Sequence, residues 1–180
     1  MDERALRVAE AIRSAGADWV ILTAPASVSY ATGHGEPAGA GRSPFAGGPA
    51  VAIVSARGET VLVAADADLD PGAVRADATR TYPAFALPPG GPGLDGLYLA
   101  AVAAALAETG AGGTVAIEPA ACPDGVLRLL EGVTTVDVAA GLRDARATKT
   151  AEEVERLRAC AALTAVGQRA ARAAAVIGMT

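Results

Sequence analysis

The chain alternates between short apolar runs and longer segments in which apolar residues recur at helical spacing. Runs rich in β-branched residues predict buried strands, and apolar residues three and four positions apart predict helices. Predicted strands occupy 19–23, 50–54, 59–64, 78–84, 114–118 and 134–138, and predicted helices occupy 3–15, 94–109, 122–131 and 151–175. One helical turn is expected within 27–35, ending at Gly33, and another short helix within the acidic segment 66–76.

The strands 50–54 and 59–64 are separated by a very short connection that contains Gly58. A tight hairpin needs a residue with positive φ, which glycine adopts without strain, so these two strands should be antiparallel. The later strands alternate with helices, and crossover helices connect parallel strands. The sequence therefore predicts an α/β fold with a mixed β-sheet flanked by helices.

The last thirty-odd residues differ from the rest of the chain. Thr150 and Glu153 have the spacing of a capping box, in which each residue's side chain bonds the other's backbone amide. A long helix should follow, with Val154 and Leu157 among the apolar residues along one side. The chain then reaches the apolar segment 176–180, whereas natural termini are usually polar and loosely held. We therefore expect this helix to pack against a partner that the chain does not contain.

Composition excludes several classes of partner. The chain has 180 residues, of which 46 are alanine and 52% are apolar, so it can bury a core made of small side chains. Fifteen basic and twenty acidic residues give a net charge of −5, and only 3% of residues are aromatic. Nucleic acid requires a basic surface and stacking aromatics, and an anionic membrane also attracts basic segments. Neither is an expected partner.

Several patterns indicate a reduced, cytoplasmic protein. No apolar stretch approaches the roughly 20 residues of a membrane span, and the N-terminus lacks the pattern of a signal peptide. The two cysteines, Cys122 and Cys160, lie far apart, which suggests neither a disulfide framework nor a metal knuckle. We expect both to be small core residues.

Few side chains suggest chemistry by themselves. His34 is the only histidine, and a lone histidine without a nearby cysteine or second histidine cannot form a metal site. We expect it to be solvated in a loop, with a structural or neutral role. The acidic residues 66–70 resemble the start of a calcium loop, but Pro71 stands where that loop requires glycine. Ser27 and Ser29 should cap or line the short helix, since nothing in the sequence activates either as a nucleophile.

Two segments carry a family pattern. In PASVSYATGHG (25–35), Tyr30, Thr32 and Gly33 take the form Tyr-x-Thr-Gly. In LRDARATKTAEEVERLRACAALT (142–164), the form Arg…Lys-x-x-x-Glu-x-x-x-Leu-Arg-x-Ala is matched by Arg146, Lys149, Glu153, Leu157 and Arg158, with a one-residue departure at the final alanine. With this separation and this order of strands, the sequence resembles the creatinase/prolidase/aminopeptidase P family of pita-bread metallohydrolases over nearly its whole length.

The resemblance implies a ribonuclease-H-like N-terminal domain at 1–147, followed at 148–180 by a linker and the first helix of a truncated catalytic domain. In the family, two Asp, one His and two Glu of the catalytic domain hold two divalent metal ions that activate water. The resemblance therefore implies no catalytic residue, metal ligand or cofactor in this chain, which should be inactive alone. The two ions, Mn, Co or Zn, belong to the absent catalytic domain, which is the implied partner.

The implied parent is a cytoplasmic, homodimeric hydrolase that cleaves Xaa-Pro bonds as an aminopeptidase or dipeptidase. Two alternatives stay open: a creatinase-like enzyme that hydrolyses C–N bonds of small molecules, and a stand-alone binding or assembly module. The resemblance also implies that the loop after the first short helix faces the substrate cleft, often of a neighbouring subunit. The substrate-cleft candidates are Tyr30, His34, Glu36, Arg42 and Phe45. Arg42 is the best of them, because an exposed guanidinium can pair with a substrate carboxylate, but a solvated surface arginine is the interpretation that ranks first.

Overall fold

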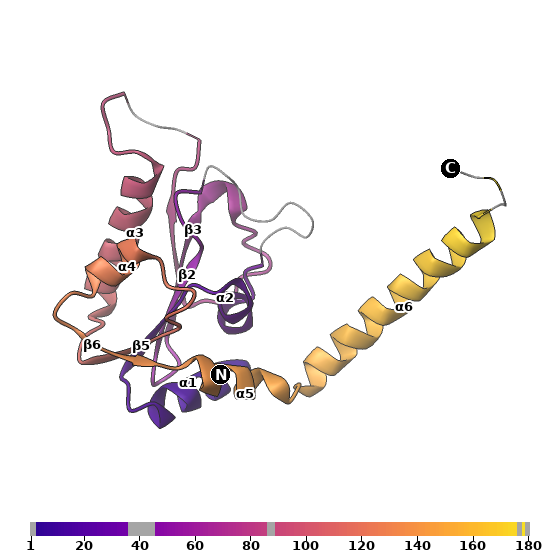
Figure 1. Ribbon diagram of the computed structural model, residues 1–180, viewed down its shortest axis with the longest axis horizontal. Coiled ribbons are helices and arrows are strands. Elements are labelled where there is room, and N and C mark those ends of the chain that lie inside the picture. The colour runs from indigo at the N-terminus through magenta and orange to yellow at the C-terminus, as the bar shows by residue number, and fades with distance from the viewer. Residues whose placement is uncertain (1–2, 36–45, 86–88, 176–177, 179–180) are drawn as a thin grey trace. The chain divides into compact units, whose positions relative to one another are not determined.

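The computed structural model describes residues 3–35, 46–85, 89–175 and 178. The chain divides into two compact units, Met1–Arg146 and Ala147–Thr180, and each is described by itself. In the first unit, six strands form one mixed sheet with helices on both faces (Figure 1). The strands are β1 (Trp19–Leu22), β2 (Val51–Ser55), β3 (Thr60–Ala65), β4 (Ala78–Tyr82), β5 (Thr114–Ile117) and β6 (Thr134–Asp137).

The strand order is β4-β3-β2-β1-β5-β6. The hairpin prediction is confirmed: β2 and β3 are antiparallel, with Val51 opposite Val63, and Gly58 has a φ of 93° in the turn between them. β1 is also antiparallel to β2, whereas the pairs β1–β5, β5–β6 and β3–β4 are parallel. The mixed sheet predicted from the alternating pattern is therefore confirmed.

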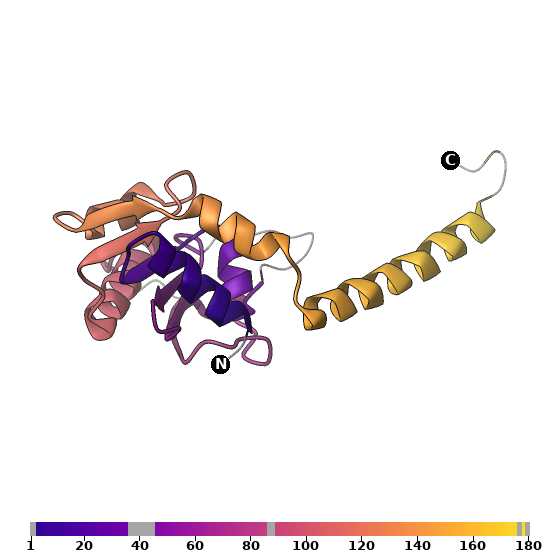
Figure 2. The same ribbon diagram turned by 90° about the horizontal axis from the view of Figure 1, so that it is seen from below.

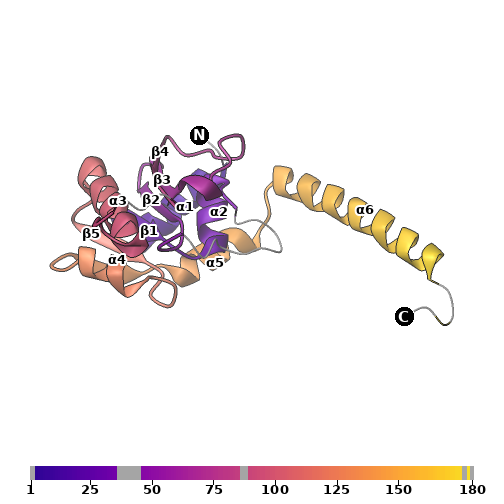
Figure 3. The same cartoon turned by 90° about the horizontal axis from the view of Figure 1, so that it is seen from above.

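Two layers of helices cover the sheet. One face carries α1 (Glu3–Ser14), α2 (Pro25–Thr32) and α5 (Ala139–Ala147), and the other carries α3 (Leu94–Thr109) and α4 (Asp124–Leu129). Figure 3 shows α3 and α4 on the side of the strands opposite α2. A short 3₁₀ helix, η1 (Asp66–Asp68), follows β3 as expected. Each face buries its own apolar cluster, and neighbouring strand residues alternate between the two clusters.

The helix α5 was not predicted. It lies alongside α1 in Figure 2, and Leu142 is its only buried residue. Its polar and apolar residues do separate at helical spacing, but the segment is short, has only one large apolar side chain, and contains Gly141, which lowers helix propensity. The segment therefore reads as a connection in sequence, although it closes one face of the sheet.

The second unit contains α6 (Ala151–Ala174). Its predicted capping box is confirmed: Glu153 N donates to Thr150 Oγ1 at 3.1 Å, and Thr150 N donates to Glu153 Oε2 at 2.8 Å. None of the residues of α6 is buried. Within the described residues, no helix combines the length and the apolar character that crossing a membrane requires.

Candidate functional site

Of the five substrate-cleft candidates, the structure places Tyr30 and His34. Glu36, Arg42 and Phe45 lie outside the described residues. Tyr30 is buried on α2, and its hydroxyl donates to the carbonyl oxygen of Ala145 in α5 at 3.2 Å. Tyr30 therefore holds two helices together on one face of the sheet.

His34 is 4% exposed, so the expectation that it is solvated is wrong. Gly33 ends α2 in a left-handed conformation, and the His34 amide donates to Thr32 Oγ1 at 3.1 Å. This turn brings His34 against α2, where it lines a cavity of about 10 Å³ with Thr23, Pro25, Val28 and Ala50. A space of that size holds about one water molecule. It is too small for a substrate.

A buried polar network connects three elements on the same face. Ser27 Oγ donates to Glu118 Oε1 at 2.8 Å and accepts from Arg146 Nη1 at 2.7 Å. Ser27 lies in the first turn of α2, Glu118 directly follows β5, and Arg146 lies in the last turn of α5. The sequence predicted only that Ser27 caps or lines the short helix. Its two partners are 91 and 119 residues away, so no local pattern could have indicated them.

The last turn of α5 receives two further donors. A helix leaves its last carbonyl groups without partners of its own, and the Ala145 carbonyl accepts from Arg7 Nη1 at 3.3 Å as well as from Tyr30. Arg7 also donates to Glu3 at 2.6 Å, and this hydrogen bond raises the pKa of Arg7. A fixed positive charge at a helix C-terminus is favourable because it opposes the negative end of the helix dipole.

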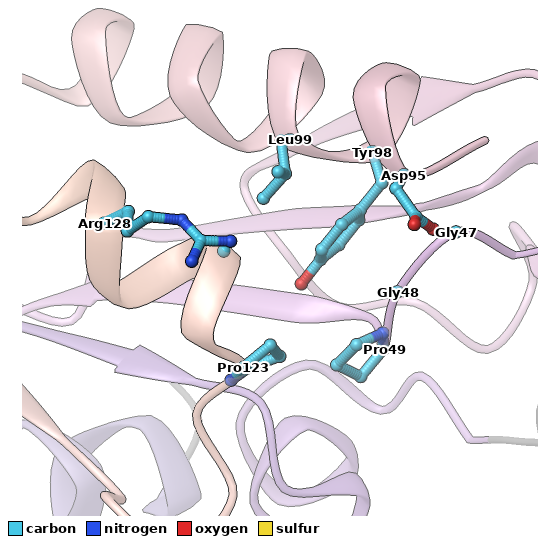
Figure 4. A pocket seen from close by; sticks show the side chains of 9 residues that line it. Gly47, Gly48, Pro49, Asp95, Tyr98, Leu99, Pro123 and Arg128 are labelled. Carbon is cyan, nitrogen blue, oxygen red and sulfur yellow. The ribbon is translucent and has the colours of Figure 1, made fainter. Parts of the chain in front are cut away.

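A pocket of about 320 Å³ lies on the other face, between α3, α4 and the loop 47–49 (Figure 4). Arg128 reaches over it from α4, and Tyr98 packs edge-on to Tyr82 with ring centroids 5.8 Å apart. The loop approaches α3 closely: a Cβ on Gly48 would lie 2.2 Å from the Tyr98 ring, so only glycine fits there. Among the described residues, this lining includes no serine, cysteine or histidine, and thus offers no activated nucleophile.

The described residues also lack a metal site. No group of three or more His, Cys, Asp or Glu side chains among them is placed to hold an ion. Cys122 is buried, which raises the pKa of its thiol to about 11. Cys160 is exposed, so its expected place in the core is wrong, because α6 buries none of its side chains. The part of the chain that the structure describes therefore does not fit a pair of divalent metal ions.

Comparison with known proteins assigns this architecture to a family. The family model described as the creatinase/prolidase N-terminal domain matches residues 4–160. No curated protein matches the sequence significantly.

Solved structures with a similar fold include three dipeptidases. A Xaa-Pro dipeptidase from Bacillus anthracis has 16% identity and a TM-score of 0.58, with 85% of this chain and 38% of that chain covered. A dipeptidase from Pyrococcus horikoshii OT3 has 16% identity and a TM-score of 0.59, with 84% and 38% covered. A Creatine_N superfamily domain of a dipeptidase from Streptococcus thermophilus has 12% identity and a TM-score of 0.55, with 80% and 98% covered.

At sequence identities of 12–16%, the similarity to these structures establishes the fold alone. The chain spans 38% of the length of the two longer dipeptidases and 98% of the separate domain. The family model matches most of the chain, and the mixed six-stranded sheet with its two helix layers is the fold that these structures share. The chain therefore belongs to the creatinase/prolidase N-terminal domain family.

Proposed function

We propose that this chain contains the non-catalytic N-terminal domain of a metal-dependent hydrolase that acts as a Xaa-Pro aminopeptidase or dipeptidase. Family membership supports this proposal, as does the fold that the chain shares with a Xaa-Pro dipeptidase and other dipeptidases. In the proposal, the first unit shapes the surroundings of the reaction, and a separate catalytic domain performs it with two divalent ions, Mn, Co or Zn.

The observation that carries the proposal is the contrast between the two units. Both apolar clusters of the first unit consist of residues between 8 and 142. The following helix α6 buries none of its residues, and Leu157, Leu163 and Val166 are 56%, 75% and 54% exposed. Burying one such side chain is worth about 1.5–3 kcal/mol, so a helix of this kind is expected to find a partner. The catalytic domain is the partner we propose.

The first unit contributes to the substrate cleft through the segment that follows α2. Arg42 pairs with a substrate carboxylate, and Glu36 and Phe45 line the cleft beside it. Tyr30 and His34 are both buried, so in this proposal they have a supporting role and do not contact the substrate directly. The working form is a cytoplasmic homodimer. In this chain, we propose that α6 provides the surface for self-association. Comparing the sedimentation of the chain with that of a Leu157→Glu variant would test this, because the charge should weaken the association.

The test compares this chain with the protein that its reading frame encodes beyond Thr180. Both are assayed for cleavage of an Xaa-Pro dipeptide with added manganese, cobalt or zinc, and again with a chelator. We expect cleavage by the longer protein alone, lost with the chelator. Metal-dependent cleavage by the 180-residue chain would refute the assignment of a non-catalytic domain.

Two other functions would give different results. A creatinase-like parent would hydrolyse a C–N bond of a small molecule such as creatine and leave the dipeptide intact. A stand-alone binding or assembly module would have no coding sequence for a metal site after Thr180. Against the module stands α6, because an independent monomeric protein is expected to bury leucines that are as exposed as Leu157 and Leu163.

A further inference from the structure

We infer that Ser27, Glu118 and Arg146 form a latch, which holds the last turn of α5 on the sheet and so fixes the point where the chain leaves the first unit. We call these three residues the α5 latch. They are positioning residues: they act through the segment that follows α5, and none of them is a catalytic group. The value of the latch to an enzyme rests on the proposed function, but its existence does not.

The hydrogen bonds of the latch have only one possible direction. A guanidinium can only donate and a carboxylate can only accept, so the Ser27 hydroxyl must accept from Arg146 and donate to Glu118. The two distances, 2.7 and 2.8 Å, are typical of charge-assisted bonds. The serine therefore joins a cation on α5 to an anion beyond β5, and a residue without a hydroxyl cannot do this.

Burial makes the latch costly to open. Glu118 is 8% exposed, and its second oxygen, Oε2, is shielded from solvent and has no hydrogen-bond partner among the described residues. A buried carboxylate is unfavourable unless a counter-charge compensates it, and Arg146 is the cation that the hydrogen-bonded path reaches. If the last turn of α5 frays, Arg146 leaves and the buried charge loses this compensation. The electrostatics thus favour the closed state.

The last turn of α5 is held by polar contacts because apolar packing ends at Leu142. Leu142 is its only buried side chain, and it lies one turn before Arg146. Beyond Leu142, the latch and the two donors to the Ala145 carbonyl help to tie the last turn of the helix to the first unit. When the latch is closed, residues 147–150 therefore follow an ordered helix end that is fixed to the first unit. When it is open, they follow a frayed and more mobile segment.

The sequence provides a selective probe of this opening. Lys149 is the only lysine in the chain, and it is exposed, so a protease specific for lysine can cut at one place only, three residues beyond Arg146. A protease needs several residues on each side of the cut in extended form, which requires both the end of α5 and the capped first turn of α6 to fray. At low protease concentration, the cleavage rate follows the population of the open form.

We expect Ser27→Ala and Arg146→Met each to speed cleavage after Lys149 by at least about tenfold, as loss of a hydrogen bond to a charged group implies. The double variant should be cut no faster than the faster single variant, because both changes remove the same bond. Glu118→Gln keeps an acceptor for Ser27 but removes the charge, and should give a smaller acceleration. Unchanged cleavage in the single variants, or additive effects in the double variant, would overturn the latch.

The matched control is Arg13→Met. Arg13 Nη1 donates to the Ala56 carbonyl at 2.7 Å, a bond as short as that of Arg146 but made to the turn between β2 and β3 instead of to α5, so cleavage should not change. Arg146 is only half-buried, so Arg146→Met keeps the test decisive if Ser27→Ala weakens the whole unit. The assay needs no enzymatic activity. If the protease assay supports the latch but the longer protein cleaves no peptide, the proposed function is refuted and the latch is not.

Discussion

Truncation of the chain tests whether the first unit folds by itself and whether α5 belongs to it. One shortened chain ends at Ala147 and keeps α5 entire. The other ends at Asp137 and lacks α5 as well as α6. All six strands remain in both chains, so the comparison isolates the contribution of the two C-terminal helices.

The structure predicts very different costs for the two truncations. None of the residues of α6 is buried, so we expect its removal to change the free energy of unfolding by about 1 kcal/mol or less, which includes the new carboxylate at the negative end of α5. Ending at Asp137 removes Val138 and Leu142, both fully buried, at about 1.5–3 kcal/mol each. The expected loss of about 3–6 kcal/mol is a large part of the roughly 5–15 kcal/mol that stabilises a domain.

Urea unfolding, followed by the fluorescence of the single tryptophan, measures both free energies. Trp19 lies on β1 and packs against the cluster under α3 and α4, so it reports on the sheet rather than on α5 or α6. We expect a cooperative transition with nearly the original midpoint for the chain that ends at Ala147, and a much lower midpoint for the shorter one. A broad transition in the longer chain would show that α6 contributes to this core. Equal midpoints in the two truncated chains would refute the place of α5 in the first unit.

Two further predictions concern single side chains. Gly48→Ala places a Cβ 2.2 Å from the Tyr98 ring and should lower the free energy of unfolding in urea by about 1–3 kcal/mol. Gly112→Ala is the control and should have a far smaller effect, because the nearest atom to its Cβ is at 3.7 Å. Equal effects of the two substitutions would contradict the close packing at Gly48. In the folded chain, a thiol reagent should modify Cys160 rapidly and Cys122 slowly. Burial raises the pKa of Cys122 from 9.0 to about 11, so the thiol ionises at lower pH in the unfolded chain than in the folded chain. The free energy of unfolding should therefore fall between pH 9 and 11. A Cys122→Ala variant should lack that part of the decrease.

Local patterns in the sequence account for most elements of the fold. The hairpin at Gly58, the helix that ends before Gly110 and the capping box of α6 each depend on residues close together in the chain, and the structure confirms all three. α5 was missed because its helical pattern covers only nine residues and contains a single large apolar side chain.

The candidate site shows the same limit more strongly. His34 appeared solvated because it lies among glycines, yet the turn after Gly33 buries it against α2. Ser27 acquires its role from Glu118 and Arg146, which approach it only when β5 and α5 take their places. Contacts between residues about 100 positions apart depend on the topology of the fold, which a local residue pattern does not reveal.

The strand order also determines when the first unit can form during synthesis. β1, β2 and β3 are neighbours in the chain and can pair early, but β1 must also pair with β5, so the centre of the sheet stays open on one side until residues 114–117 have been made. Such distant pairing slows folding, because a long loop must close first. Synthesis proceeds at about 5–20 residues per second, so 147–180 follow the completed unit within a few seconds. The β1–β5 pair therefore postpones completion of the sheet until β5 has been synthesised, however early the hairpin forms.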